Sequence, residues 1–214
     1  MIKSKKRKHL MVIISIVAII LIEPVYPRQA AIAKTDVSID EYKEQLNSVN
    51  IDGIAYKDYV AMHDINKRAD EEYIIEAEDY VHAEDMEIEK YVDYEGMEGI
   101  SVYTGEKGLI EYEVHIREEG FYNISFLYYP VKGKSASIQR AIFIDGMLPY
   151  KELALVEFPR VFVNANDEWQ RDNRGNDLKP KQIEAPQWIT GYCYDSEGYE
   201  TEELSVYLDE GTHT

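Results

Sequence analysis

Two acidic side chains at close spacing are the first feature of the sequence that points to chemistry. Glu76 and Glu78 lie two positions apart in an expected strand over residues 73–80. Residues two apart on a strand point to the same side, and paired hard oxygen ligands suit calcium. The competing interpretation is a solvated acidic strand face. The sequence thus predicts either a structural calcium site at this pair or a plain acidic surface.

A long polar segment over residues 164–194 contains both tryptophans of the chain. Aromatic faces stack on the C–H faces of sugar rings, and neighbouring Asp and Asn side chains bind hydroxyl groups. The segment therefore predicts a sugar-binding site made of Trp169, Arg171, Asp172, Asn173, Asn176 and Trp188. Two other interpretations stay open: the tryptophans fill the core, or the loop is tied by its own Asp–Arg and Asn–backbone hydrogen bonds.

Catalytic motifs are not found in the sequence. There is no HExxH motif and no Ser-His-Asp order, and the histidines beyond the first nine residues are isolated. A glycosidase pair needs two acids about 5–10 Å apart across a cleft, but with 41 acidic residues some pair lies close in any fold. The single cysteine, Cys193, excludes an internal disulfide and is expected as a buried small hydrophobe. We therefore expect no enzyme.

Net charge excludes one class of partner. The 214 residues include 41 acidic and 23 basic side chains, which gives a formal charge of −18. A chain this acidic repels phosphate backbones, so nucleic acid is excluded as a direct partner. The hydrophobic fraction of 45% and the 18 tyrosines are too high for a disordered acidic tail. We expect one main domain with a sizeable core.

Residues 1–33 have the three-part pattern of a secretory signal peptide. A basic stretch over residues 1–9 precedes an uninterrupted apolar run over residues 10–22, and small residues end at Ala33, the expected cleavage point. The alternative is an uncleaved membrane anchor. A helix of 13 residues covers only about 20 Å of a hydrocarbon core that is about 30 Å thick. We therefore expect an exported protein, extracellular or at the cell surface.

The elements that position these residues change in type along the chain. Ser38 and Glu41 form a capping box for a helix, and a second short helix is expected over residues 54–63. Residues 34–70 are thus a helical lead-in, either a packed appendage or a helix pair that docks a partner.

From residue 71 onward the apolar period becomes two. Strands are expected over residues 110–116, 122–128, 138–144 and 204–208, and Asp145-Gly146 is a hairpin turn. Pro159 interrupts strand composition over residues 153–163, which indicates an edge or a bulge. Residues 71–214 therefore predict a mainly β domain, an antiparallel β-sandwich.

Five short motifs occur in order along this domain. They are residues 75–80 (IEAEDY), 90–96 (KYVDYEG), 118–124 (EEGFYNI), 144–146 (IDG) and 208–214 (LDEGTHT). In this order they resemble carbohydrate-binding modules of the galactose-binding-like jelly-roll superfamily. In those modules, acids at the place of Glu76 and Glu78 help hold a structural calcium, together with a ligand from the closing strand.

Longer motifs support a closer resemblance. They are residues 128–134 (YYPVKGK), Arg140, and residues 158–161 (FPRV), 171–180 (RDNRGNDLKP) and 184–188 (EAPQW). These look like the N-terminal regions of large bacterial extracellular solute-binding proteins of ABC transporters, where a jelly-roll module precedes a two-lobed domain. The resemblance implies export, a role in sugar uptake and no catalytic residue. The implied partners are an oligosaccharide, a solute-binding domain and the transporter permease.

The sequence departs from that family at Thr214, where the closing strand and the solute-binding domain would follow. We therefore expect a fragment of a longer protein or a stand-alone remnant, with one sheet position left empty. Two alternative functions stay open: a structural or docking domain without a ligand of its own, and an accessory module of a cell-surface glycoside hydrolase.

Overall fold

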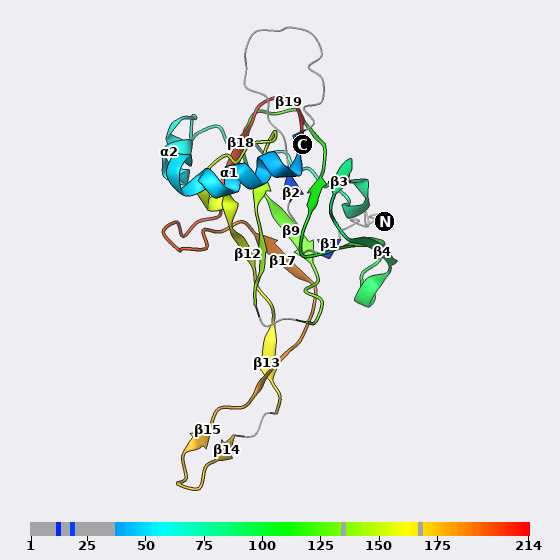
Figure 1. Ribbon diagram of the computed structural model, residues 1–214, viewed down its shortest axis with the longest axis vertical. Helices are drawn as coiled ribbons and strands as arrows, with labels where there is room; N and C mark the ends of the chain where they lie inside the picture. Colours follow the sequence, from blue (N-terminus) through cyan, green and yellow to red (C-terminus); the bar gives the residue numbers. More distant parts are fainter. Residues whose placement is uncertain (1–11, 14–17, 20–36, 134–135, 167–168) are drawn as a thin grey trace, which may run out of the picture.

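The computed structural model describes residues 12–13, 18–19, 37–133, 136–166 and 169–214. These residues form a β-rich body with two helices against it and a narrow two-stranded arm extending away from it (Figure 1). The expected signal peptide over residues 1–33 lies outside the described residues, apart from residues 12–13 and 18–19. Within the described ranges, no helix is long and apolar enough to cross a membrane.

Two helices open the described body, as the capping pattern predicts. Helix α1 spans Ile39–Asp52, and the Glu41 carboxylate accepts the backbone N–H of Ser38 at 2.7 Å. Helix α2 spans Tyr56–Ala61 and buries Tyr59 in the main core. The Tyr59 hydroxyl accepts the backbone N–H of Tyr207 at 2.9 Å. The helices are therefore packed on the strands and joined to them by hydrogen bonds.

Antiparallel pairs make up most of the body, which confirms the mainly β, antiparallel class. The pairs are β3 (His82–Glu84) with β6 (Leu109–Glu111), β4 (Ile88–Val92) with β5 (Ile100–Thr104), β7 (Val114–Ile116) with β19 (Gly211–His213), β8 (Gly120–Asn123) with β18 (Ser205–Leu208), β9 (Ser125–Tyr128) with β17 (Ile189–Tyr192), and β10 (Ile138–Arg140) with β12 (Val156–Phe158). Short 3-10 helices connect some of them: η1 (Ala77–Asp79), η2 (Tyr94–Gly96) and η3 (Lys151–Ala154).

The N-terminal apolar run adds two short parallel pairings. β1 (Val12–Ile13) pairs with β5, and β2 (Ala18–Ile19) pairs with both β6 and β11 (Ile142–Phe143). The resulting strand order is β11-β2-β6-β3. Both neighbours of β2 are deeply buried, because Ile110 and Ile142 are 0% exposed. These pairings require residues 1–33 to stay attached, so cleavage after Ala33 would remove them from the body.

The prediction of a strand over residues 73–80 is wrong. Residues 73–76 are irregular, and the chain then turns through η1, where Asp79 N–H donates to the carbonyl of Glu76 at 3.0 Å. Ladder pairing begins only at Val81, whose N–H donates to the carbonyl of Glu111 at 2.8 Å. A 3-10 helix has three residues per turn, so residues two apart do not share a face. The same-side argument for Glu76 and Glu78 therefore fails with the strand.

The other expected strands are present, with local breaks. Residues 110–116 divide into β6 and β7, and residues 122–128 into β8 and β9. Asp145 and Gly146 both have positive φ, 55° and 72°, as the expected hairpin turn requires. Pro159 separates β12 from β13 (Phe162–Asn164). Cys193 is 1% exposed, and burial raises the pKa of its thiol to about 12, so the expected buried hydrophobe is confirmed.

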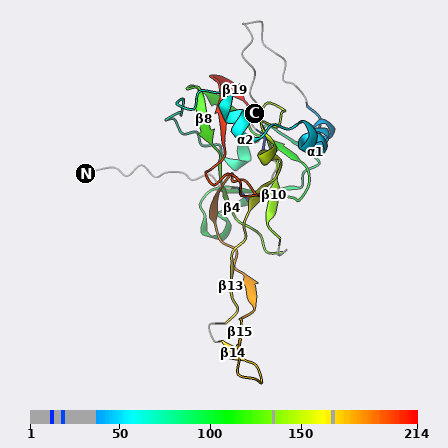
Figure 2. The ribbon, with the colours of Figure 1, turned by 90° about the vertical axis from the view of Figure 1, so that its left-hand side faces the viewer.

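The arm consists of residues 162–184. At its base β13 pairs with β16 (Gln182–Glu184), and near its tip β14 (Gln170–Arg171) pairs with β15 (Asp177–Leu178). Figures 1 and 2, at right angles to each other, both show the ribbon leaving the body. Glu184 fixes the base, because its carboxylate lies 3.6 Å from Arg160 Nη1 and accepts the N–H of Gly133 at 3.0 Å. The described residues of the arm thus form a hairpin, and residues 189–192 of the long polar segment return to the body as β17.

Candidate functional site

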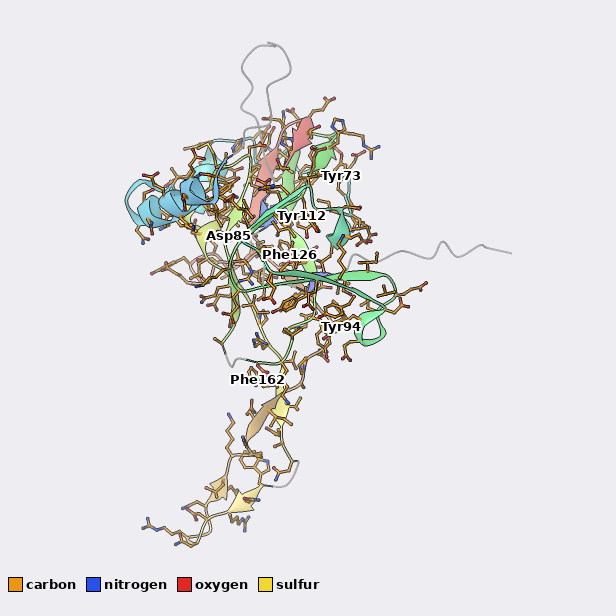
Figure 3. All side chains as sticks on the ribbon, turned by 45° about the vertical axis from the view of Figure 1, so that its right-hand side comes forward. Tyr73, Asp85, Tyr94, Tyr112, Phe126 and Phe162 are labelled. Atoms are coloured by element: carbon orange, nitrogen blue, oxygen red, sulfur yellow. The ribbon has the colours of Figure 1, made fainter. Side chains whose placement is uncertain are left out.

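A cleft of about 410 Å³ opens on the body beside the irregular segment 68–75. The other side of the cleft is formed by the chain from Tyr112 to Phe126, which includes β7 and β8, and by Leu208. Tyr73, Tyr112 and Phe126 are three of its lining residues, and Figure 3 shows them on the body, away from Phe162 at the base of the arm. The cleft is therefore a feature of the body alone.

The lining of the cleft combines apolar and polar side chains. Its apolar part consists of core residues and half-buried aromatics: Ile75, Tyr112, Val114, Ile116, Phe121, Tyr122, Ile124, Phe126 and Leu208. Its polar part consists of the exposed side chains of Arg68, Glu72, Asn123 and Ser125 and the half-buried side chain of Glu71. Aromatic surface with a few hydrogen-bonding groups is the usual lining of a small-molecule pocket.

The segment 68–75 is held in place as the outer wall of the cleft. Phe121 N–H donates to the carbonyl of Lys67 at 2.8 Å, and Arg68 forms a parallel bridge with Phe121. Arg117 N–H donates to the Tyr73 hydroxyl at 2.8 Å. Gly120 permits this close approach, because a Cβ there would lie 2.9 Å from the carbonyl oxygen of Lys67. The wall is thus fixed by backbone contacts at one end and by a tyrosine at the other.

The Tyr112 and Tyr122 hydroxyls in the cleft stay protonated near neutral pH. Burial raises the pKa of Tyr122 to about 12, and nearby Tyr73 adds to the shift. Burial likewise raises the pKa of Tyr112, whose hydroxyl donates to the carbonyl of Ala77 at 3.1 Å. Neutral hydroxyls act as hydrogen-bonding groups rather than as nucleophiles. The chemistry that this lining offers is recognition of a partly apolar ligand.

Five of the six residues expected to bind sugar lie together on the arm, and Trp188 lies apart from them. Trp169, Arg171, Asp172, Asn173 and Asn176 lie toward the tip of the arm, and Trp188 lies past its base. Trp169 is 60% exposed. The structure therefore separates the two tryptophans by most of the length of the arm, so they cannot form one site in a single copy.

The tip of the arm is tied by its own hydrogen bonds, which confirms that interpretation of the polar run. The Asp172 carboxylate accepts the backbone N–H groups of Arg174 and Asn176, each at 2.8 Å, and the Asn176 side-chain amide at 2.9 Å. These hydrogen bonds, the Asn176 side chain first, lower the pKa of Asp172. Arg171 Nε donates to the Asp177 carboxylate at 2.9 Å. Ligand binding by this loop stays a prediction.

Trp188 packs in an aromatic cluster at the lower end of the body. Its ring centroid lies 5.2 Å from that of Tyr129 and 6.3 Å from that of Tyr94. Tyr94 stands edge-on to Tyr129, with centroids 5.3 Å apart. The Trp188 Nε1 atom is buried and has no hydrogen-bond partner among the described residues. The mutual ring contacts favour a packed cluster for Trp188 over an open stacking platform.

The acidic pair does not form a metal site with its described surroundings. Calcium takes six to eight oxygen ligands, but the described residues contain no group of three or more His, Cys, Asp or Glu side chains that fits a metal ion. One carboxylate oxygen of Glu78, Oε2, is buried without a hydrogen-bond partner in the described residues. These residues alone do not fit calcium, and calcium at Glu76 and Glu78 stays a prediction.

The sequence does not predict the cleft. Tyr112, Tyr122 and Phe126 have the spacing of core residues, and only Tyr112 is fully buried. The other two are half-buried at the cleft, because the segment that faces them is irregular and does not cover them. No sequence signal distinguishes such a position from the core.

Comparison of the chain with protein-family models, with curated proteins and with solved structures gives no match.

Proposed function

We propose that the protein is a non-catalytic module that binds a carbohydrate in the cleft beside segment 68–75. The observation that carries the proposal is the lining of this cleft, in which aromatic faces lie next to side chains that bind hydroxyl groups. Its volume of about 410 Å³ falls in the range of small-molecule pockets. The motif order over residues 75–214 supports a jelly-roll sandwich of the galactose-binding-like type.

The setting of the module follows from the same resemblance. The leader pattern over residues 1–33 supports export, and the longer motifs support an origin in the N-terminal part of a solute-binding protein for sugar uptake. In that setting the module holds a glycan near the transporter, and structural calcium at Glu76 and Glu78 requires oxygen ligands from outside the described residues. The alternative, a structural or docking domain, is favoured by a separate observation, the projecting arm.

The test is a titration of the full chain with mono- and oligosaccharides, followed by thermal melting and calorimetry. A ligand that binds only the folded state raises the melting midpoint. Asn123→Ala removes an amide from the cleft and breaks its 2.8 Å hydrogen bond to Glu203. The matched control is Gln139→Ala, which breaks a similar 2.8 Å bond to Glu157 outside the cleft.

We expect at least one saccharide to raise the midpoint, and Asn123→Ala to weaken its binding about threefold to tenfold, the worth of one hydrogen bond. Phe126→Ala removes the aromatic face and should abolish binding while the protein still melts cooperatively. Gln139→Ala should bind like the unaltered chain. The proposal is refuted if no saccharide binds the folded protein, or if binding is indifferent to both cleft variants.

A further inference from the structure

The lining of the cleft beside segment 68–75 divides into two parts that differ in burial. Five lining residues with exposed fractions between 1% and 9% form the cleft floor: Tyr112, Val114, Ile116, Phe121 and Leu208. The polar lining residues other than Glu71 are all exposed: Arg68, Glu72, Asn123 and Ser125. A ligand in the cleft therefore meets apolar surface where it is buried and polar side chains where it stays in contact with water.

The cleft floor offers no free side-chain donor to a ligand. Among its five side chains only Tyr112 has a polar atom, and that hydroxyl donates to the carbonyl of Ala77 at 3.1 Å. The backbone there is engaged by the pairing of β7 with β19 and of β8 with β18, and Phe121 N–H donates to the carbonyl of Lys67. A group that rests on the floor thus gains apolar contact and little hydrogen bonding.

The half-buried tyrosines of the cleft use their hydroxyls within the protein. The Tyr73 hydroxyl donates to the Glu71 carboxylate and accepts the backbone N–H of Arg117 at 2.8 Å. The Tyr122 hydroxyl donates to the carbonyl of Glu118. The two rings lie 5.9 Å apart between centroids. These residues therefore offer a ligand their aromatic surface rather than a free donor.

Three polar side chains of the cleft remain available for a ligand. Arg68, Glu72 and Ser125 make no side-chain hydrogen bond or ion pair with the described residues. A guanidinium group, a carboxylate and a hydroxyl together supply both donors and acceptors, as the hydroxyl groups of a sugar require. All three side chains are exposed. Polar recognition in the cleft is thus the role of its exposed lining.

A bare sugar ring does not suit the cleft floor. A pyranose carries hydroxyl groups around its edge, and a hydroxyl taken out of water without a new hydrogen bond costs free energy. An alkyl or aryl group on the same floor instead gains affinity, about fourfold for each buried methylene. The two parts of the lining therefore select a ligand that has one apolar and one hydroxylated part.

We propose that the cleft binds glycosides with an apolar aglycone. The aglycone rests on the cleft floor, and the sugar lies against Arg68, Glu72 and Ser125. This inference rests on the proposed carbohydrate function and narrows its ligand class. The cleft volume of about 410 Å³ leaves room for both parts of such a ligand. Aryl glycosides and glycolipids share this chemistry, and the probes below distinguish them.

The test is calorimetric titration of the full chain with probes kept below micelle-forming concentrations. The probes are the methyl, butyl and hexyl β-D-glucosides, the matching β-D-galactosides, phenyl β-D-glucoside and hexan-1-ol. The first pair of variants probes the apolar lining. Ile75→Ser places a hydroxyl in the half-buried lining, and Ile88→Ser is its control, at a half-buried isoleucine of β4 that packs against the same core outside the cleft.

The second pair of variants probes the polar lining. Arg68→Gln removes the guanidinium at the sugar end of the cleft. Lys107→Gln is its control, because it makes the same change in charge at an exposed body residue outside the cleft. Arg68→Gln should weaken every glycoside by the same factor and leave hexan-1-ol unaffected.

We expect the affinity of at least one glycoside series to rise at least about thirtyfold from methyl to hexyl, because five methylenes are added and each is worth up to about fourfold. Hexan-1-ol should bind at least tenfold more weakly than the hexyl glycoside. Ile75→Ser should flatten the rise with chain length, and both controls should behave like the unaltered chain. Tighter binding of phenyl than of hexyl glucoside supports an aryl aglycone, and the reverse order supports an alkyl chain.

The outcomes separate this inference from the function on which it rests. Methyl and hexyl glycosides of equal affinity overturn the inference and leave carbohydrate binding standing. Hexan-1-ol that binds as tightly as the hexyl glycosides overturns both, because the sugar then contributes nothing. A chain that binds none of the probes and no other saccharide overturns the carbohydrate function and this inference with it.

Discussion

Tyr59→Phe tests whether helix α2 is an integral part of the body. The Tyr59 hydroxyl accepts the backbone N–H of Tyr207 at 2.9 Å, and both residues are 9% exposed. Burial raises the pKa of Tyr59 to about 12, so the hydroxyl is neutral near neutral pH. The substitution removes one oxygen and leaves the ring, which packs 4.9 Å from the Tyr150 centroid. Its effect therefore isolates one hydrogen bond.

The magnitude follows from what the substitution leaves behind. Tyr207 lies in β18 and is 9% exposed, so its N–H loses its acceptor at a buried position. A buried donor without a partner costs about 1–3 kcal/mol. At about 2–4 °C per kcal/mol for a domain of this size, the melting midpoint falls by roughly 2–12 °C. The ring contributes almost nothing to the change, because its volume and its contacts are kept.

Urea denaturation of the full chain, followed by tyrosine and tryptophan fluorescence, measures this loss. The matched control is Tyr199→Phe, which removes the hydroxyl of a side chain that is 82% exposed and should change the free energy of unfolding by less than about 0.5 kcal/mol. If the two variants unfold at the same urea concentration, this hydrogen bond does not hold helix α2 on the body, and the claim that the helix is an integral part of the body is refuted.

Three further perturbations have outcomes that the structure sets. Gly191→Ala brings a Cβ to 2.9 Å from the Tyr128 ring and should cost about 1–3 kcal/mol in urea unfolding, whereas Gly133→Ala, with open space around it, should cost little. Deletion of residues 1–33 removes the pairings of β2 with β6 and β11. Each lost hydrogen bond is worth about 1 kcal/mol, so the free energy of unfolding should fall by several kcal/mol. A urea unfolding curve that the deletion leaves unchanged contradicts the pairing. Burial lowers the pKa of His213, but the side chain of Asp145 and a backbone carbonyl outweigh it and raise the pKa overall. His213 thus adds stability that is full below about pH 6.5 and is lost as pH rises through the raised pKa. The difference in unfolding free energy between the unaltered chain and His213→Asn should shrink over that rise, and a constant difference argues against a charged His213.

Local signals in the sequence were sufficient for the helices and for the tight hairpin. The capping box depends only on Ser38 and Glu41, which lie within four residues of each other, and the hairpin turn depends only on the adjacent residues Asp145 and Gly146. The strand expected over residues 73–80 is absent, because residues 73–76 are irregular and Ala77–Asp79 form a 3-10 turn. The choice depends on a long-range partner: pairing with β6 begins only at Val81. Such information lies outside any local window.

The cleft shows why a site of this kind is hidden in sequence. Tyr122 and Phe126 repeat with the period of a strand face, and that period is the same whether an element covers the face or leaves it open. The covering segment joins this face through Tyr73 and Gly120, contacts between residues distant in the chain. Trp169 and Trp188, expected in one sugar site, are apart for a related reason, because they are close in sequence but lie at different ends of a hairpin arm.

The cleft and the arm are separate parts of the molecule. Tyr73 at the cleft and Phe162 at the base of the arm lie on different parts of the body (Figure 3), and none of the residues that line the cleft belongs to the arm. A carbohydrate in the cleft therefore meets no arm residue of its own copy.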